Sequence, residues 1–429
     1  MKSSGLPPDF RKLWVGQTVS EFGSRISRAG IPLIAVITLA ATPAQMGILA
    51  AVASLPVLLF SLFVGVWVDR LRRRPLMMAM DLARMLLLLT IPIAALSGHL
   101  NMTLVYIIFA AMGVLGLVFE NAYHAYLPAL VEREHVVDAN SRLATSESLA
   151  EIGGVSIAGV LIQVISAPLA VIFDALSFLF SASCVALIRK PESAPRPPED
   201  RESMWREIVE GVRVVGQNPI LRTLAIIMAL RSFFGNFYAT LYDIYGIRDL
   251  GLTPGLLGFV IAAGGVGTLI GALVASRLQK RFRLGSVLIG SLLLNAVIGL
   301  LHPLAGGSVL LASTMLIIPQ VIGDGAMMIY LINSISLQQM VVPNHLLGRT
   351  NASFGFLAQG IAPAGALISG ALATSLGARG TFWIAALGWL AAALWFSRSP
   401  VRHLEGYAVV EAESDLTPVD QERVNFLSP

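Results

Sequence analysis

The sequence predicts an all-α membrane protein in which twelve transmembrane helices form two pseudo-symmetric six-helix bundles. The composition is the first observation, because 55% of the 429 residues are hydrophobic and only 13% are charged, against about 25% charged in soluble domains. Apolar runs long enough to cross a membrane follow one another along the whole chain. Motifs of the first half also return in the second half.

Each apolar run has about 20 residues or more, the length that a helix needs to cross the hydrocarbon core. The runs lack the strict alternation of strands in an outer-membrane barrel. The predicted helices cover 13–40, 43–68, 76–97, 102–124, 143–166, 168–189, 219–246, 254–278, 285–305, 308–332, 350–375 and 380–399.

Lysine and arginine concentrate in alternate loops, for example at 70–74, whereas the opposite loops hold only Arg248 and Arg379. The positive-inside rule assigns the basic loops to the cytoplasm. An even number of helices then places both termini in the cytoplasm, and we expect a multi-pass protein of the bacterial inner membrane. The net charge of +4 has the same origin, so we expect the lipid bilayer and no nucleic acid as a partner.

The chain divides into four predicted parts. Residues 1–189 form the N-terminal bundle, and 219–399 form the C-terminal bundle. The cytoplasmic linker at 190–218 is rich in proline and charge and contains an amphipathic helix, whose apolar face indicates contact with the membrane surface. Residues 400–429 are acidic, lack apolar runs and are predicted to be a disordered cytoplasmic tail.

Two pairs of similar segments indicate an internal repeat. Gly65 in GVWVDRLRRRP corresponds to Gly271 in GALVASRLQKRFR (271 − 65 = 206), and His135 corresponds to His345 (345 − 135 = 210). Parallel repeats around an axis along the membrane normal are typical of transporters, in which the two halves rock around a site between them.

The loop between the second and third helices carries a family motif of the form GxxxDRxGRR. Gly65, Asp69, Arg70, Arg73 and Arg74 match it, and Arg72 replaces the second glycine. On these residues the chain resembles the major facilitator superfamily, over about residues 10–400. FRKLWVGQTVSEFGS at 10–24, FDALSFLFSA at 173–182, WREIVEGVRVVGQNPILR at 205–222 and VPNHLLGR at 342–349 resemble its macrolide-efflux and enterobactin-exporter branch.

The resemblance implies the major facilitator fold and a secondary active transporter that works by alternating access. We expect a monomeric, proton-coupled exporter of an amphipathic small molecule, drug-like or siderophore-like. The alternative is an uptake or lipid-translocating carrier of the same fold. A remote alternative, an intramembrane enzyme, is disfavoured because the sequence lacks a convergent catalytic set. We expect no cofactor and no metal, and the absence of GxxxxGK[ST] argues against ATP as the direct energy source.

Ionisable residues within the membrane are costly and mark candidate sites. Glu21, Arg25 and Arg28 share one face of the first helix, where Glu21 and Arg25 can pair at i,i+4. Arg231 follows Glu21 by 210 residues, so the two could face each other across the pseudo-symmetry axis. The charges form either a structural ion-pair network or a set of arginine donors for an anionic substrate group. The predicted substrate-binding residues are Glu21, Arg25, Arg28, Arg231, Asn236 and Asp324.

A carboxyl group in apolar surroundings can hold a proton near neutral pH, and proton-driven transport needs such a carrier. Glu21, Glu151 and Asp324 are the proton-coupling candidates because they lie deep in their predicted helices. A hydrogen bond between packed helices is the alternative for each of them. Asp174, and Asp81 with Arg84, are expected to serve packing.

In the superfamily that the chain resembles, the motif loop acts as a cytoplasmic latch. The resemblance implies that Asp69 caps a helix of the other half, predicted here near Thr350 and Asn351, and that the arginines meet acids of the fourth helix. Glu120, or the loop acids Glu132 and Glu134, could receive Arg70 or Arg73. The predicted gating residues are Gly65, Asp69, Arg70, Arg73, Arg74 and Glu120.

Glycines in the fifth and eleventh helices indicate close helix contacts, because a missing side chain lets two backbones approach. The residues concerned are Gly153, Gly154, Gly159, Gly360, Gly365 and Gly370.

Overall fold

The predicted all-α fold is confirmed. The computed structural model describes residues 7–69, 71–132, 135–190, 192, 213–342 and 346–404, and over these ranges the regular elements are helices without strands. Arg70, Glu134, His345, most of the predicted linker with its amphipathic helix, and residues 405–429 of the predicted tail lie outside the described residues.

The first bundle contains six rods, two of which continue through a π-helical turn. They are α1 (Pro8–Leu33) with η1 (Ile34–Thr38), α2 (Pro43–Asp69), α3 (Arg73–Leu96), α4 (Met102–Leu130), α5 (Val136–Leu149) with η3 (Ala150–Gly154) and α6 (Val155–Ile165), and α7 (Ala167–Ala186).

The second bundle also contains six rods. They are α9 (Pro219–Ile244) with η4 (Tyr245–Asp249), α10 (Pro254–Arg281), α11 (Leu284–Gly299) with α12 (Leu301–Leu304), α13 (Val309–Ile318) with η5 (Pro319–Gly323) and α14 (Asp324–Val341), and the two parts of α15 (Leu347–Ser397), after which comes η6 (Pro400–His403). Gly377, with φ of 71°, breaks α15 into two rods.

Ten stretches of the described chain have the length and apolar composition of a membrane span. One of them, Ser353–Ser397, contains both rods of α15. The rod α1 is not among the ten because it carries six charged side chains. The twelve predicted helices are therefore the ten stretches, with Ser353–Ser397 counted as two rods, and α1.

The two bundles repeat with one constant offset. Pro8 and Pro219 open equivalent helices (219 − 8 = 211), and the π turns η1 and η4 follow each at the same offset. Ser166, with φ of 86°, separates α6 from α7 as Gly377 divides α15, again 211 residues later. With this offset Arg231 corresponds to Ser20 rather than to Glu21, because the sequence estimate of 210 was one residue short.

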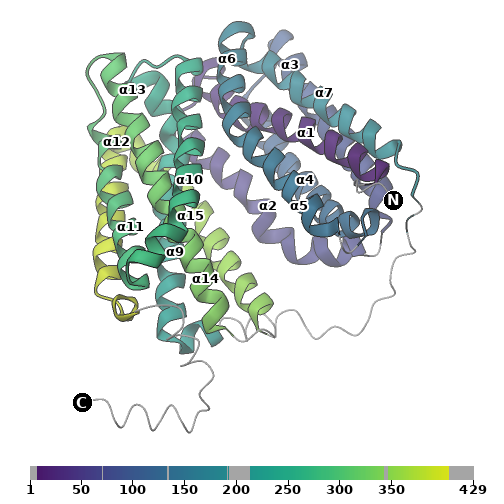
Figure 1. Cartoon of the computed structure of the whole chain (residues 1–429). Helices are drawn as coiled ribbons and strands as arrows, with labels where there is room; N and C mark the ends of the chain where they lie inside the picture. Colours follow the sequence, from purple (N-terminus) through teal and green to yellow (C-terminus); the bar gives the residue numbers. More distant parts are fainter. Residues whose placement is uncertain are drawn as a thin grey trace.

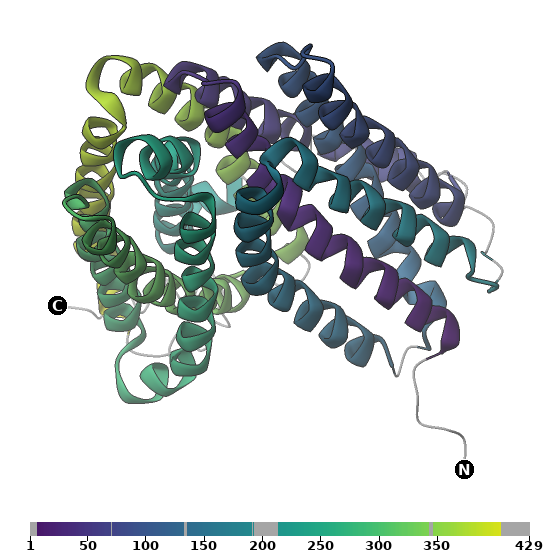
Figure 2. The same cartoon turned by 90° about the horizontal axis from the view of Figure 1, so that it is seen from above.

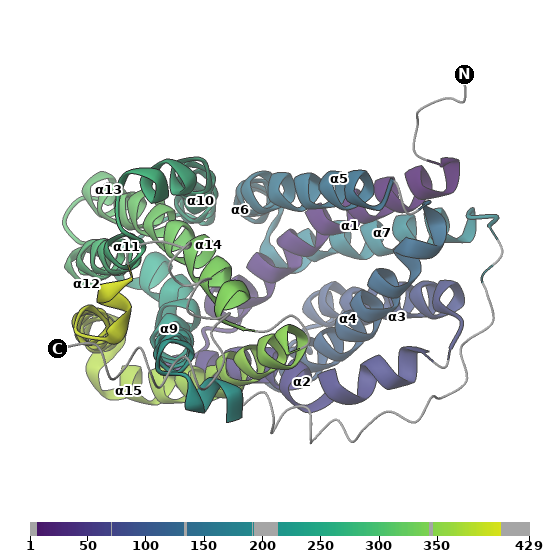
Figure 3. The same ribbon diagram turned by 60° about the horizontal axis from the view of Figure 1, so that its bottom comes forward.

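The bundles meet at one end and diverge at the other (Figure 1). Figure 2 shows the two crossings at the end where they meet, with the start of α2 beside α15 and α6 beside α10. A Cβ atom on Gly370 would lie 2.7 Å from the carbonyl oxygen of Pro43, and one on Gly159 would lie 2.6 Å from that of Pro254. We call this the closed end, and the opposite end, seen in Figure 3, the open end. The expected close contacts at Gly159 and Gly370 are therefore present.

Arg248 ties the bundles together at the closed end. Its Nη1 donates to the carbonyl oxygen of Ala41 and its Nη2 to that of Val36, each at 2.7 Å, so one guanidinium bonds both η1 and the loop before α2. Arg379, the other arginine outside the basic loops, donates to Ala305 within its own bundle at 2.8 Å. Arg248 thus forms hydrogen bonds between the two bundles, whereas Arg379 forms its hydrogen bond within the second bundle.

The charges predicted to serve packing lie inside the first bundle. Arg84 pairs with the fully buried Asp81, and its guanidinium lies between the rings of Phe119 and Phe178, at 4.3 Å and 4.2 Å from their centroids. Asp174 is also fully buried and accepts a hydrogen bond from the neighbouring Ser177 hydroxyl at 3.1 Å. These contacts agree with the expected packing role.

We predict that Gly159→Leu destabilises the protein, because its side chain would collide with the backbone of α10 and overpacking costs about 1–3 kcal/mol. The thermal unfolding midpoint in detergent should fall. The matched control is Gly290→Leu, because Gly290 is exposed and a Cβ there would meet nothing within 4 Å. Equal midpoints for the two variants would contradict the close packing.

We predict that Arg248→Gln opens the closed end, because it removes charge-assisted hydrogen bonds worth about 1.5–3 kcal/mol each. The reporter is Leu252→Cys in a Cys184→Ser background, since Leu252 is 3% exposed at the closed end. Its maleimide labelling should accelerate roughly tenfold or more. Arg379→Gln should leave the labelling rate unchanged, and equal acceleration in both variants would show that Arg248 has no special role.

Candidate functional site

The first candidate site is a cluster of three carboxylates around one arginine in the first bundle. Arg25 on α1 contacts Glu151 through Nη1, and its Nη2 lies 3.6 Å from Glu21 and 3.9 Å from Glu147. The predicted i,i+4 pair of Glu21 and Arg25 is therefore present. The arginine belongs to an ion-pair network, as one of the two sequence interpretations held.

The backbone explains how this cluster forms. Glu151 lies in η3, a π turn that interrupts the rod of α5 and α6, and π turns often occur at functional positions. A Cβ atom on Gly154 would lie 2.9 Å from Cβ of Arg25, so the glycine gives the arginine stem room to pass. The expected close contact at this glycine is therefore present.

The cluster has more negative than positive charge. Arg25 is buried, with 9% of its side chain exposed, whereas 36% of Glu21, 66% of Glu147 and 52% of Glu151 are exposed. Arg28, three residues further along α1, is exposed, and among the described residues no carboxylate lies within ion-pair distance of it. The acids therefore remain accessible to protons while they share one buried cation.

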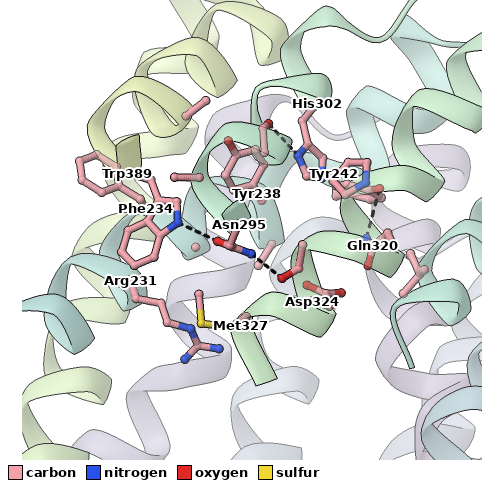
Figure 4. A pocket seen from close by; sticks show the side chains of 18 of the residues that line it. Arg231, Phe234, Tyr238, Tyr242, Asn295, His302, Gln320, Asp324, Met327 and Trp389 are labelled. Carbon is pink, nitrogen blue, oxygen red and sulfur yellow. Dashed lines mark hydrogen bonds between the residues drawn. The ribbon is translucent and has the colours of Figure 1, made fainter. Parts of the chain in front are cut away.

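The second candidate site is a cavity of about 380 Å³ inside the second bundle (Figure 4). Aromatic and ionisable side chains from α9, α12, α14 and α15 surround it, together with the amide side chains of Asn295 on α11 and Gln320 on η5. Its lining includes Arg231, Phe234, Tyr238, Tyr242, Asp243, Asn295, His302, Gln320, Asp324, Met327 and Trp389.

Hydrogen bonds fix several walls of this cavity. Trp389 donates through Nε1 to Oδ1 of Asn295 at 2.8 Å, and Asn295 donates through Nδ2 to the carbonyl oxygen of Gly323 at 2.8 Å. Gln320 donates through Nε2 to the Tyr242 hydroxyl at 3.3 Å. The chain of contacts links α15, α11, η5 and α9, so the cavity has a defined shape.

Asp324 enters the cavity where α10 has no side chain. A Cβ atom on Gly264 would lie 2.5 Å from Oδ2 of Asp324 and 2.6 Å from Oε1 of Gln320. The π turn η5 directly precedes Asp324. The glycine and the turn together allow two polar side chains to lie against the α10 backbone.

Arg231 and Asn236 belong to the surroundings of this cavity. Arg231 lines it and also a neighbouring cavity of about 380 Å³ between α9 and α15, where Asn236 lies. Arg231 interacts electrostatically with Asp324. The structure shows no ion pair between Arg231 and Glu21 among the described residues, and each has its charged neighbours in its own bundle.

Two ionisable residues of this cavity escaped the sequence analysis. Asp243 was not recognised among the buried acids, although it lies near the end of the predicted helix 219–246. His302 was not singled out either; it lines the cavity from α12, and its Nδ1 lies 3.0 Å from the carbonyl oxygen of Gly299. A tally of ionisable residues within the predicted helices 219–246 and 285–305 would have found both Asp243 and His302.

The predicted gating residues are only partly described. Gly65 and Asp69 lie in α2, near the open end, and the Asp69 side chain and the whole of Arg70 are outside the described part. Arg74 donates to the carbonyl oxygens of Val185 and Ala186 at the end of α7, at 3.1 Å and 2.6 Å.

The first turn of α3 is capped by a linker carboxylate that was not anticipated. The backbone amides of Arg73 and Arg74 donate to Glu192, at 2.6 Å and 3.2 Å. Glu120, a predicted acceptor of the motif arginines, lies 4.0 Å from Nε2 of His124, one turn further along α4. Over the described ranges no group of three or more His, Cys, Asp or Glu residues is arranged to hold a metal ion.

Comparison with known proteins identifies close relatives. The family described as transmembrane secretion effector matches residues 7–425. The multidrug efflux pump Tap of Mycolicibacterium fortuitum is 30% identical over 347 residues, which are 78% of this chain and 82% of that protein. Macrolide efflux protein A of Streptococcus pyogenes is 25% identical over 301 residues, 69% of this chain and 74% of that protein.

Solved structures share the fold. A bacterial homologue of the iron transporter ferroportin in its inward-facing state has a TM-score of 0.70 at 16% identity, covering 96% of this chain and 100% of that one. The structure of its outward-facing state has a lower TM-score of 0.55 over the same fractions of the two chains. The helices here are therefore arranged more like those of the inward-facing state. The efflux relatives also agree with the prediction that the chain is not an enzyme. With twelve helical rods over the described residues, an internal repeat and a family match over residues 7–425, the chain belongs to the transmembrane secretion effector family of major facilitator transporters.

Proposed function

We propose that this transporter is a proton-coupled exporter of amphipathic small molecules, drug-like or siderophore-like, in the inner membrane. The observation that carries the proposal is the carboxylate cluster around Arg25. Three acids share one buried arginine there and are at least one-third exposed. Such acids can take up and release protons, and the balance of charge around the arginine changes when they do.

The direction of export rests on the relatives and on the charges. The efflux pumps that this chain resembles carry multidrug and macrolide export in their names. The basic loops at the open end favour a cytoplasmic location for that end. The described conformation would then receive cargo from the cytoplasm or the inner leaflet, with both termini cytoplasmic.

The transport cycle requires the open end to close. We propose that the motif residues Asp69, Arg70 and Arg73 then form the cytoplasmic latch against the start of α15 and α4. The bundles diverge at this end in the described conformation (Figure 3), which supports a latch that forms only in the alternate state. Arg248 and the glycine crossings would have to separate in that state.

The test of export uses inside-out membrane vesicles from an expressing strain and radiolabelled erythromycin. We expect accumulation when the vesicle interior is acidic, and collapse of accumulation when nigericin dissipates the pH gradient. Vesicles without the protein are the control. Accumulation only in right-side-out vesicles would support the uptake carrier, and gradient-independent movement of a fluorescent phospholipid would support the lipid-translocating carrier.

We predict that Glu151→Gln uncouples transport from protons, because an amide in contact with Arg25 cannot exchange a proton. Uptake driven by the pH gradient should fall roughly tenfold or more, whereas equilibration of cargo down its own gradient should continue. The matched control is Asp138→Asn, which removes an exposed acid from the first turn of the same rod. Equal gradient-driven uptake by Glu151→Gln and the unmodified protein would remove Glu151 from the mechanism.

A further inference from the structure

We infer that the cavity in the second bundle binds the cationic group of an amphipathic amine, with Asp243 as its counter-ion. The inference rests on the proposed exporter function and specifies the chemistry of the cargo. It is argued from the charges, the walls and the hydrogen-bonding capacity of the cavity.

The charges of the cavity do not balance. Arg231 and Asp324 line it as one cation and one acid, and no ion pair within 4 Å joins them among the described residues. Asp243 lines the same cavity, and the structure shows no ion pair or hydrogen bond to its side chain among the described residues. A helix rises about 1.5 Å per residue, so Asp243 lies roughly 18 Å from Arg231 along α9. One end of the cavity is therefore left with an acid that has no cation beside it.

The walls near this acid suit an organic cation. Tyr238 and Tyr242 present their rings to the cavity, and His302 lies 4.8 Å from the ring centroid of Tyr238 and 5.9 Å from that of Tyr242 (Figure 4). Aromatic faces attract cations through their quadrupole. Trp389 and Phe234 extend the apolar wall toward Arg231, which provides surface for the apolar body of an amphipathic molecule.

The hydrogen-bonding groups at this end are mostly acceptors. Nδ1 of His302 faces the carbonyl oxygen of Gly299 at 3.0 Å and must donate to it, which leaves Nε2 as an acceptor in the neutral ring. Asp243 contributes two carboxylate oxygens, which only accept when ionised, whereas the Tyr242 hydroxyl accepts from Gln320 and keeps its own O–H as a donor. An ammonium group has donors and no acceptor, so it complements this set, whereas a carboxylate would meet like charge.

The repeat strengthens the assignment to one bundle. With the offset of 211 residues, Asp243 corresponds to Pro32 and Asp324 to Gly113 in the first bundle. The first bundle therefore repeats the backbone of this region without its acids. The charged cavity is an addition to the common architecture rather than a consequence of it.

The test compares three probes with one skeleton: 4-phenylbutylamine, 4-phenylbutanol and 4-phenylbutyrate. Equilibrium binding to the full-length protein in detergent at neutral pH should favour the amine over the carboxylate roughly tenfold or more. Equal affinities, or preference for the carboxylate, would overturn the inference without any variant. Equal affinity for the amine and the alcohol would also overturn it, because the acid would then contribute no charge.

Variants locate the site. Asp243→Asn should lower affinity for the amine roughly tenfold and leave affinity for the alcohol unchanged, while Asp138→Asn should change neither. If Asp243→Asn fails to fold, Trp389→Leu provides the second variant and should weaken the amine and the alcohol alike; unchanged binding of both would place the site elsewhere. Amine binding without proton-driven transport would count against the exporter proposal alone, and transport without amine preference would count against this inference alone.

Discussion

The contact between the two bundles depends on glycines, which have no side chain and let the helix backbones touch. Within a membrane, lipid is as apolar as the helices, so helices associate through close van der Waals packing, and small residues permit it. The pairs Gly47–Gly370 and Gly159–Gly258 provide this contact at both crossings, and each member of one pair lies 211 residues from a member of the other. Because the crossings are related by the pseudo-symmetry, they join the bundles at two equivalent points of the closed end. The rest of the architecture follows from where these points lie, since contact at one end leaves the other end free to open.

The repeat preserves the backbone and not the charge. Both bundles begin their first rods with proline and end them with a π turn. The first bundle then carries its ionisable cluster around Arg25, whereas the second carries its own around the cavity that Asp243 and Asp324 line. Charges inside a membrane persist only where they are paired or reach a polar cavity. The two bundles meet this requirement in different ways, which allows them to take different roles in one cycle.

The sequence was sufficient for the fold because each helix was signalled locally, by an apolar run between charged loops. The ends were less well predicted: α4 continues to Leu130 rather than 124, α5 begins at Val136 rather than 143, and α14 continues to Val341 rather than 332. Helices protrude beyond the hydrocarbon because backbone hydrogen bonding does not stop where apolar composition stops. The pair of Glu21 and Arg25 was predictable because it depends on spacing within one helix. The partnership of Arg25 with Glu151, and the joining of Asp243, His302 and Asp324 in one cavity, depend on how different helices pack.

The two candidate sites are linked through two adjacent glycines of α10. A Cβ atom on Gly264 would lie 2.5 Å from Asp324 in the second bundle, and one on Gly265 would lie 2.4 Å from Ile152 in the first. Ile152 is the neighbour of Glu151 within η3, so the side chain next to a proton-coupling candidate rests on the α10 backbone that supports the cavity. Packed interiors transmit displacement because they contain little free volume. A change in the Arg25 cluster that moves η3 therefore acts on α10, because η3 either pushes α10 with it or loses the contact between them. Alternating access requires a physical connection between the bundles, and the contact of η3 with α10 is a candidate for it.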